Sequence, residues 1–232
     1  MDLKGKIIAV TGASGTLGAA VARAAAHAGA QVALIDRAVL TAPLPPGLDD
    51  ALPLGGIDLA RPDAAEAALE RVASHYGGLD ALVNAAGAFR WETLADGSPD
   101  TWDLLHAVNV MTAVASSKAA LPCLIARGGG SIVNVGANAA ARAGAGMGAY
   151  AASKAAVARL TESLAEEMKD RGIRVNAVLP SIIDTPQNRA DMPDADFTRW
   201  VAPEALADVI LFLISDAARA VTGALVPVTG RV

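Results

Sequence analysis

The sequence predicts a doubly wound α/β fold, in which helices cover both faces of a parallel sheet. Short, β-branched apolar segments recur along the chain, and alanine-rich segments of helical period separate them. Strands of a parallel sheet are buried on both faces, so they are expected to be continuously apolar rather than alternating. The alternation of the two kinds of segment is typical of βαβ units, and a glycine-rich turn after the first strand supports the same prediction.

Each expected strand is a short apolar run bounded by Gly, Asn or Pro. The strands are expected at the runs that begin with Ile7, Val32, Leu79, Ser131, Ile173 and Ala224. The helices are expected near residues 17–28, 62–75, 100–126, 149–170 and 203–215. Ser98 before Pro99, and Pro203 before Glu204, are typical of helix starts. The segment TAPLPPGLDD holds too much proline for a long helix, so the second crossover is expected to be a loop or a short turn.

The composition limits the organisation and the partners of the chain. Its 232 residues are predicted to form one domain over residues 1–232, with enough length for a full core. The formal charge is -5 without any basic block, so nucleic acid is not an expected partner. No apolar run reaches the roughly 20 residues of a membrane span and no signal-peptide pattern is present, so we expect a cytoplasmic protein without a membrane partner. Cys123 is expected to be a structural thiol, and the histidines lack metal-ligand spacing, so no metal site is expected.

The turn after the first strand, TGASGTLG, has the features of a nucleotide-binding loop. Gly12, Gly15 and Gly18 follow one another at three-residue intervals between a strand and a helix. Such glycines allow a tight turn, a close approach of the backbone to a pyrophosphate, and close packing of the helix on the strand. No lysine follows them, which argues against the phosphate-binding loop of nucleoside triphosphatases.

Asp36, at the end of the second strand, indicates which dinucleotide is bound. A carboxylate in this place accepts hydrogen bonds from both adenosine ribose hydroxyls and repels a 2′-phosphate, so NAD(H) is favoured over NADP(H). Arg37 works against this preference, because its guanidinium could stack on adenine or meet a phosphate. The structural alternative for Asp36 is a solvated carboxylate in a turn.

Tyr150 and Lys154 are the candidate catalytic pair. Residues four apart lie on the same face of a helix, so the ammonium group can lie near the phenol and lower its pKa from about 10. A tyrosine whose pKa lies closer to neutrality can act as a general acid and base. The same spacing also occurs by chance on amphipathic helices, where the ring is a core residue and the lysine is solvated.

Together with residues 84–87 and Asn109, these motifs resemble the short-chain dehydrogenase/reductase family over nearly the whole chain. The resemblance implies a single Rossmann domain of about seven parallel strands and an NAD(P)-dependent oxidoreductase with a small-molecule substrate. It implies that Tyr150 is the general acid/base, that Lys154 holds the nicotinamide ribose and lowers the tyrosine pKa, and that Asn109 anchors a water in the proton relay. The implied cofactor-binding residues are Gly12, Ser14, Gly15, Thr16, Leu17, Gly18, Asp36, Arg37, Asp58, Leu59, Asn84, Ala85, Ala86, Gly87, Lys154, Pro180, Ile183 and Thr185.

The chain departs from the family pattern at two places. The family's substrate-binding serine, thirteen residues before the tyrosine, is replaced by Ala137, and neither Gly136 nor Asn138 restores a hydroxyl. Losing one donor to a developing oxyanion costs about 10² to 10³ in rate. Three explanations follow: Asn138 supplies its amide instead, the substrate needs no such donor, or catalysis is weak. The second departure is Thr16, which stands where most simple members have the middle glycine.

Both departures are similar to the dihydropteridine reductase branch of the family. That branch shares the glycine rhythm, the short second crossover and a serine-free segment, and its lid resembles AVLPSIIDTPQNRADMPDADFTRW. A quinonoid dihydropterin accepts hydride into a conjugated ring, so a serine for an isolated alkoxide is less needed. Pterin reduction is therefore one alternative. A catalytically weak dinucleotide-sensing or interaction protein is another.

The substrate is expected beyond the carboxyl ends of the strands, under a lid of residues 182–202. Candidate substrate residues are Ala137, Asn138, Phe89, Trp91, Met147 and Trp200, with Met192, Arg90, Arg142 and Gln187 as further candidates. Packing or surface exposure is the alternative for each. By resemblance, the helices within residues 102–126 and 149–168 form an oligomer interface, so a homotetramer or a homodimer is expected.

Overall fold

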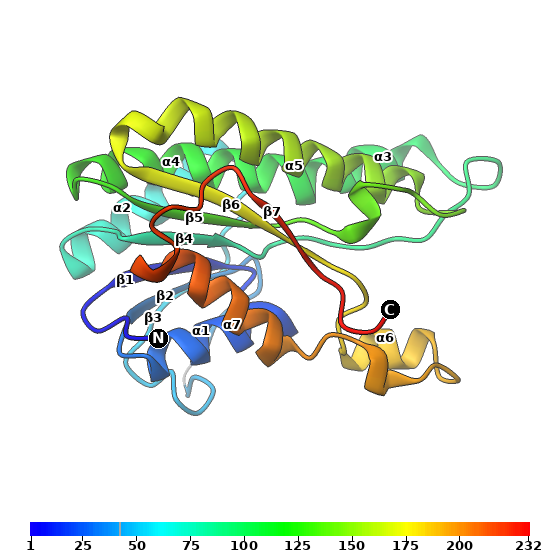
Figure 1. The fold of residues 1–232 in the computed structure, drawn as a ribbon, viewed down its shortest axis with the longest axis horizontal. Helices are drawn as coiled ribbons and strands as arrows, with labels where there is room; N and C mark the ends of the chain where they lie inside the picture. The colour runs from blue at the N-terminus through cyan, green and yellow to red at the C-terminus, as the bar shows by residue number, and fades with distance from the viewer. Residues whose placement is uncertain (42) are drawn as a thin grey trace.

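The computed structural model describes residues 1–41 and 43–232, and seven parallel strands form one sheet within these residues (Figure 1). The strand order is β3-β2-β1-β4-β5-β6-β7, and each neighbouring pair is parallel. The strands are β1 Ile7–Thr11, β2 Gln31–Ile35, β3 Leu52–Leu54, β4 Ala81–Asn84, β5 Gly130–Val135, β6 Ile173–Pro180 and β7 Leu225–Val228. The predicted doubly wound Rossmann-type sheet of about seven parallel strands is thereby confirmed.

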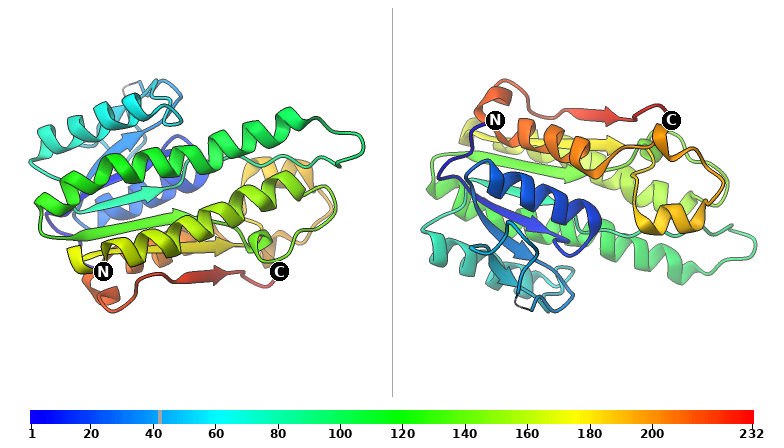
Figure 2. Two further views of the ribbon diagram at one scale, coloured as in Figure 1. Left: turned by 90° about the horizontal axis from the view of Figure 1, so that it is seen from above. Right: turned by 90° about the horizontal axis from the view of Figure 1, so that it is seen from below.

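Helices cover both faces of the sheet, as Figure 2 shows from its two sides. The helices are α1 Thr16–His27, α2 Pro62–Tyr76, α3 Pro99–Leu105, α4 Thr112–Ala126, α5 Gly148–Met168, α6 Pro186–Asp191 and α7 Pro203–Ile214. Helices α1 and α7 pack together on one face, and α2, α4 and α5 lie on the other. Two buried apolar clusters, one on each side of the sheet, form the core. Pro99 and Pro203 begin α3 and α7, and Ser98 caps α3 by accepting a hydrogen bond from the Asp100 amide.

The edge strand β3 was not among the strands expected from the apolar runs. It has only three residues, Leu52–Leu54, with Pro53 in the middle. A proline cannot donate to a strand ladder, but an edge strand tolerates it on its open side. The proline-rich second crossover contains no helix among its described residues, in agreement with the loop or turn predicted for it; Ala42 lies outside the described residues.

The single helix expected near residues 100–126 is interrupted. Between α3 and α4 the chain follows a π-helix, His106–Met111, without leaving the helical path. A π-helical turn inserts one extra residue per turn and therefore rotates the side chains that follow it; such turns are frequent at functional sites. Asn109 lies within this turn and is buried. Periodicity gave no sign of the interruption, because a π-turn leaves the apolar composition unchanged.

The continuous helical stretch Pro99–Ala126 corrects one expectation about apolar length. It has 28 residues and a mean hydropathy of 1.4 in its most apolar window, so by length and composition alone it could cross a membrane. Half of that window is buried inside the fold, and α4 packs against α2, β4 and β5. The helix that covers a sheet in a protein core has the same properties, so the stretch is weak support for a membrane span.

Candidate active site

The glycine-rich turn brings the end of β1 against the segment that follows β4. Gly12 has a φ of +64°, and a Cβ atom there would lie 2.8 Å from the backbone of Ala86. A Cβ atom at Gly18 would overlap the Gly12 carbonyl group. Both glycines are therefore required by close backbone packing. Gly15 is different, because a Cβ there would meet only the Gly12 carbonyl oxygen, at 3.3 Å.

The N-terminus of α1 is open to an anion. Gly15 is its N-cap, no side chain of the described residues caps it, and its first turn holds no acidic residue. The first N–H groups of a helix lack intrahelical partners, and with the helix dipole they favour negative charge. This end of α1 therefore suits a pyrophosphate.

Asp36 stands at the end of β2 beside this turn. One carboxylate oxygen accepts a hydrogen bond from the Ser14 amide and the other from the Ala38 amide, each at 2.8 Å. These bonds fix the carboxylate at the wall of a cavity of about 370 Å³. Arg37 lines the same cavity. The strand order reverses between β1 and β4, and ligands of doubly wound sheets bind at such a switch point.

Ten of the residues expected to bind the cofactor line this cavity, namely Gly12, Ser14, Gly15, Asp36, Arg37, Asp58, Leu59, Ala85, Ala86 and Gly87. Thr16, Leu17 and Gly18 lie in the first turn of α1 and do not line the cavity. Sequence reasoning missed further lining residues, which are Ile57, Ala60, Leu104, Ala107, Val108 and Thr112. Four of these, Leu104, Ala107, Val108 and Thr112, stand at positions i, i+3, i+4 and i+8 on both sides of Asn109. This helical spacing in the sequence could have indicated that they share a face with one another. The glycine cradle, the open helix end and the fixed carboxylate together fit a dinucleotide.

Tyr150 and Lys154 lie in the first two turns of α5, on one face. Burial raises the pKa of Tyr150 to about 12. Lys154 is only 5% exposed, and burial lowers its pKa to about 8. Its Nζ lies 6.0 Å from the centre of the Tyr150 ring and donates a hydrogen bond of 2.7 Å to the Val135 carbonyl oxygen. Burial therefore raises the tyrosine pKa in this structure, opposite in direction to the lowering expected from a neighbouring ammonium group.

Asn109 connects the loop after β4 to α5. Its Nδ2 donates to the Ala88 carbonyl oxygen at 3.0 Å and to Ser153 Oγ at 2.9 Å, while its Oδ1 accepts from the Ala88 amide at 2.8 Å. Ser153 Oγ in turn donates to the Tyr150 carbonyl oxygen. The amide of Asn109 thus holds the backbone on both sides of the candidate site.

Gly87 joins the cavity to the catalytic candidates. It lines the same cavity as Asp36, and a Cβ atom placed on it would lie 2.8 Å from Asn109 Oδ1 and 3.3 Å from Lys154 Nζ. Asn84, three residues earlier, does not line the cavity and connects β4 to α4 and to β5. Its Nδ2 donates to Ser117 Oγ and to Asn134 Oδ1, and its own Oδ1 is buried without a partner among the described residues.

The candidate substrate residues near Tyr150 differ in exposure: Phe89, Trp91 and Asn138 are exposed, Met147 is half buried and Ala137 is buried. Phe89 is half exposed, and its ring meets the Tyr150 ring edge-on at 4.9 Å. Trp91 is also exposed, and its Nε1 donates to the Ala145 carbonyl oxygen, close to half-buried Met147. Ala137 is buried, whereas Asn138 is exposed and its side chain makes no hydrogen bond to a described residue.

The segment expected to form the lid, residues 182–202, follows β6, which ends at Pro180. Thr185 caps α6 by accepting a hydrogen bond from the Asn188 amide, and Ile183 pairs with Val201 in an isolated parallel bridge. Trp200 is 8% exposed and packs its ring against Phe197, 4.7 Å away. Trp200 therefore packs within the fold against Phe197 and does not line the dinucleotide cavity.

Comparisons with known proteins agree with this geometry. A family model described as enoyl-(acyl carrier protein) reductase matches residues 12–230. A 2-(S)-hydroxypropyl-CoM dehydrogenase from Xanthobacter autotrophicus is 34% identical, and the match covers 98% of this chain and 96% of that protein. A 3-oxoacyl-(acyl-carrier-protein) reductase from Thermotoga maritima is 35% identical over 99% of this chain and 98% of the relative.

Solved structures have the same fold. A short-chain dehydrogenase from Burkholderia cenocepacia, in complex with NADP, superposes with a TM-score of 0.89 at 36% identity, covering 99% of this chain and 98% of that one. A short-chain type dehydrogenase/reductase from Mycobacterium ulcerans reaches the same TM-score at 25% identity. The relatives named here are not dihydropteridine reductases, so the resemblance to that branch stays a prediction.

Proposed function

This chain belongs to the short-chain dehydrogenase/reductase family, and we propose that it moves a hydride between a nicotinamide dinucleotide and a small carbonyl compound, alcohol or conjugated imine. Family membership makes it an NAD(P)-dependent oxidoreductase that acts on a small-molecule substrate. The position of Gly87 carries the rest of the proposal. This residue lines the dinucleotide cavity, and a Cβ atom on it would lie 2.8 Å from Asn109 Oδ1 and 3.3 Å from Lys154 Nζ, so the cofactor cavity adjoins the proton-moving groups.

The residues that would hold the dinucleotide are those of the glycine turn, the open end of α1, Asp36 and the loop after β4. When bound, the dinucleotide supplies or accepts the hydride. Tyr150 is held protonated at neutral pH, since burial raises its pKa to about 12, and this is the state that gives a proton to the substrate oxygen during reduction. Lys154 in its ammonium form stabilises the phenolate that remains until solvent returns the proton. Asn109 is a positioning residue, because it fixes the loop at Ala88 and, through Ser153, the start of α5.

Oxidation of NADH and of NADPH by the purified protein tests this proposal, with ketones, quinones and quinonoid dihydrobiopterin as substrates. Turnover that disappears in Tyr150→Phe supports hydride transfer with Tyr150 as the acid. The Phe ring keeps the edge contact with Phe89, so the variant should retain its fold and its affinity for NADH. Tight NADH binding without turnover of any substrate would instead favour the dinucleotide sensor.

We propose that NAD(H) is preferred, and the position of Asp36 supports this. Its carboxylate is fixed by the Ser14 and Ala38 amides at the cavity wall and would repel a 2′-phosphate. The test compares kcat/KM for NADH and NADPH in the wild type and in Asp36→Asn. The preference for NADH should fall by about tenfold or more, the effect of one hydrogen bond to a charged group. An unchanged ratio would mean that Arg37, on the same wall, controls the preference.

Pterin reduction is the second candidate, and the buried Ala137 favours it. A conjugated ring needs no separate donor for an alkoxide, so the missing hydroxyl costs little with a pterin and about 10² to 10³ in rate with an isolated ketone. The variant Ala137→Ser separates the two. If the natural substrate is a ketone, the variant should turn ketones over faster than the wild type does. If the natural substrate is a pterin, the variant should turn the pterin over at the same rate as the wild type or more slowly. Asn138→Ala tests in the same assay whether that amide replaces the serine.

We further propose a homotetramer or a homodimer. Trp102, Ile125 and Phe212 are large apolar side chains that are exposed on α3, α4 and α7. Burial of such surface between copies would lower the free energy of association. The native mass from light scattering on a size-exclusion column tests this proposal, and a monomer at micromolar concentration would contradict it.

A further inference from the structure

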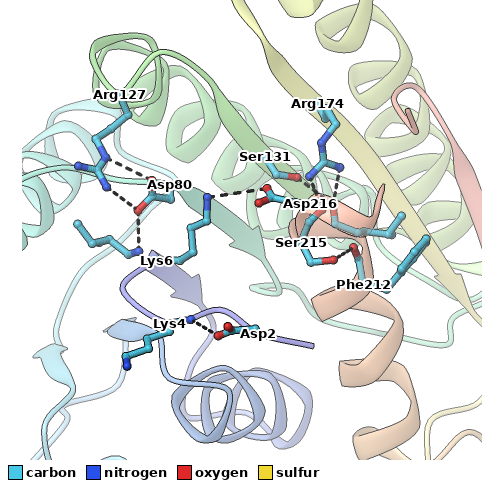
Figure 3. Close-up of polar contacts among 12 residues, drawn as sticks. Asp2, Lys4, Lys6, Asp80, Arg127, Ser131, Arg174, Phe212, Ser215 and Asp216 are labelled. Carbon is cyan, nitrogen blue, oxygen red and sulfur yellow. Dashed lines mark hydrogen bonds and ion pairs between the residues drawn. The ribbon is translucent and has the colours of Figure 1, made fainter. Parts of the chain in front are cut away.

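We propose that the amino-terminal end of the sheet holds a second ligand site, which binds a phosphate dianion or a phosphate monoester. An open cavity of about 490 Å³ lies there, at the end of the strands opposite to the dinucleotide cavity. The starts of β1, β4, β5 and β6 and the segment after α7 surround it. Figure 3 shows several of the side chains that line it, which are those of Lys6, Asp80, Arg127, Arg174 and Asp216.

The cavity carries an excess of positive charge, although the whole chain has a formal charge of -5. Its charged lining residues are the cations Lys6, Arg127, Lys169, Arg174 and Arg219 and the carboxylates Asp80 and Asp216. An excess of cations in a hollow raises the local concentration of anions. Because the protein as a whole has a negative net charge, we expect anions to gather at the cavity and not over the rest of the surface.

Two of the five cations are already neutralised by neighbours. The Arg127 guanidinium donates to both oxygens of Asp80, at 3.2 and 3.1 Å (Figure 3). Lys169 pairs with Glu166 at 2.6 Å, on the rim. These pairs frame the site but leave little charge for a ligand.

Of the remaining three cations, only Lys6 has a carboxylate of a described residue within 4 Å. Arg174, half buried, donates to the carbonyl oxygens of Leu213 and Ser215, which are neutral acceptors at the end of α7 (Figure 3). Burial lowers the pKa of Arg174, and nearby Asp216 acts against this lowering. Lys6 reaches Asp216 only at 3.8 Å, and the Asp216 side chain is 89% exposed. Arg219 is exposed and makes no ion pair with any described residue.

This balance fits a doubly charged tetrahedral anion. Three cations against one weakly held carboxylate leave an excess of about two charges, which a phosphate dianion matches. Guanidinium groups bind phosphate oxygens through paired N–H donors, so Arg219 and the outer N–H groups of Arg174 are suited to it. The concave shape fits a compact anion better than an extended acidic peptide.

Titration of inorganic phosphate into the full-length protein at constant ionic strength tests the site, with calorimetry as the readout. The variant Arg219→Gln removes one charge without disturbing a hydrogen bond of the described fold, and should weaken binding about tenfold. Arg23→Gln is the matched control, because Arg23 is an exposed arginine of α1 outside the cavity, and it should leave the affinity unchanged. Glycerol phosphate in a parallel titration distinguishes a monoester from free phosphate as the preferred ligand.

Backbone amide NMR shifts in the same titration locate the ligand independently of enzymatic activity. The proposal expects the largest shifts at Gly128, Gly129, Gly130 and Gly172, which line the cavity. Shifts confined to residues 12–15 would assign the anion to the dinucleotide site and overturn the proposal. Three further results would overturn the proposal. They are shifts that depend only on ionic strength, equal weakening of phosphate binding in Arg219→Gln and Arg23→Gln, and binding of an acidic peptide without any binding of phosphate.

Discussion

At the carboxyl ends of the strands the protein buries a few ionisable groups, whereas at the amino ends it gathers many charged groups in contact with water. Lys154 is 5% exposed and has no carboxylate partner, and burial alone moves its pKa and that of Tyr150. At the amino ends, the cationic groups of Lys6 and Arg127 lie beside carboxylates, and that of Arg174 lies beside carbonyl oxygens. Desolvation makes a site reactive, because it brings pKa values away from their usual range, while solvated charge clusters favour binding. We therefore expect both dinucleotide binding and hydride transfer at the carboxyl end of the sheet, and binding alone at the amino end.

The largest effect that tests this contrast is the loss of the Tyr150 hydroxyl. Tyr150→Phe should lower kcat by about 10² to 10⁴, the usual contribution of general acid–base catalysis. Steady-state kinetics with the best substrate measures the change. Phosphate binding at the amino-terminal cavity should be unaffected, and a parallel loss there would show that the two ends are not independent.

Gly12→Ala should be the next largest effect, through the fold of the dinucleotide end. The new Cβ would lie 2.8 Å from the Ala86 backbone at a φ of +64°, so we expect a loss of more than about 2 kcal/mol in the free energy of unfolding and weak NADH binding. Gly56→Ala is the matched control, since its φ is +73° but nothing lies within 4 Å of its Cβ position. Urea denaturation of both variants separates the effect of the crowded Cβ atom from the effect of the positive φ. Equal losses in the free energy of unfolding would contradict the argument that crowding against Ala86 is the main cause.

The buried lysine gives a pH-dependent prediction. The Lys154 pKa of about 8 lies below its unfolded value near 10.5, so between these values the unfolded chain binds more protons and the stability must rise with pH. This one group should add about 2 kcal/mol between pH 7.5 and 9.5. Tyr150 acts in the opposite direction only above pH 10, because its pKa is raised. Urea denaturation across this window should show the rise in the wild type but not in Lys154→Met; parallel curves would contradict the burial of an unpaired ammonium group.

The sequence predicted the two ends of the sheet unequally. The dinucleotide end was foreseen because glycine spacing and Asp36 are local features of one βαβ unit. The π-helical turn at Asn109 was missed, since it changes hydrogen bonding but not composition. β3 was missed because Pro53 in a three-residue run reads as a loop until a neighbouring strand pairs with it. The amino-terminal cavity was also missed, because only the parallel sheet brings its charged residues together, which are Lys6, Asp80, Arg127, Lys169, Arg174, Asp216 and Arg219.

The smallest predicted effect concerns the framework of that cavity. Asp80 accepts two hydrogen bonds from Arg127 and one of 2.8 Å from the Ile7 amide, and its side chain is 15% exposed. Asp80→Asn keeps the shape but removes the charge, so we expect a loss of about 1 kcal/mol in the free energy of unfolding and an unchanged kcat. Asp63→Asn is the control, because Asp63 makes a similar pair with Arg61 but both side chains are 68% exposed, and its effect should be near zero. Removing the Asp80 carboxylate also frees the charge of Arg127, so the same variant should bind phosphate more tightly although it is less stable. Weaker phosphate binding in Asp80→Asn would mean that the carboxylate orders the cavity more than it competes with the anion.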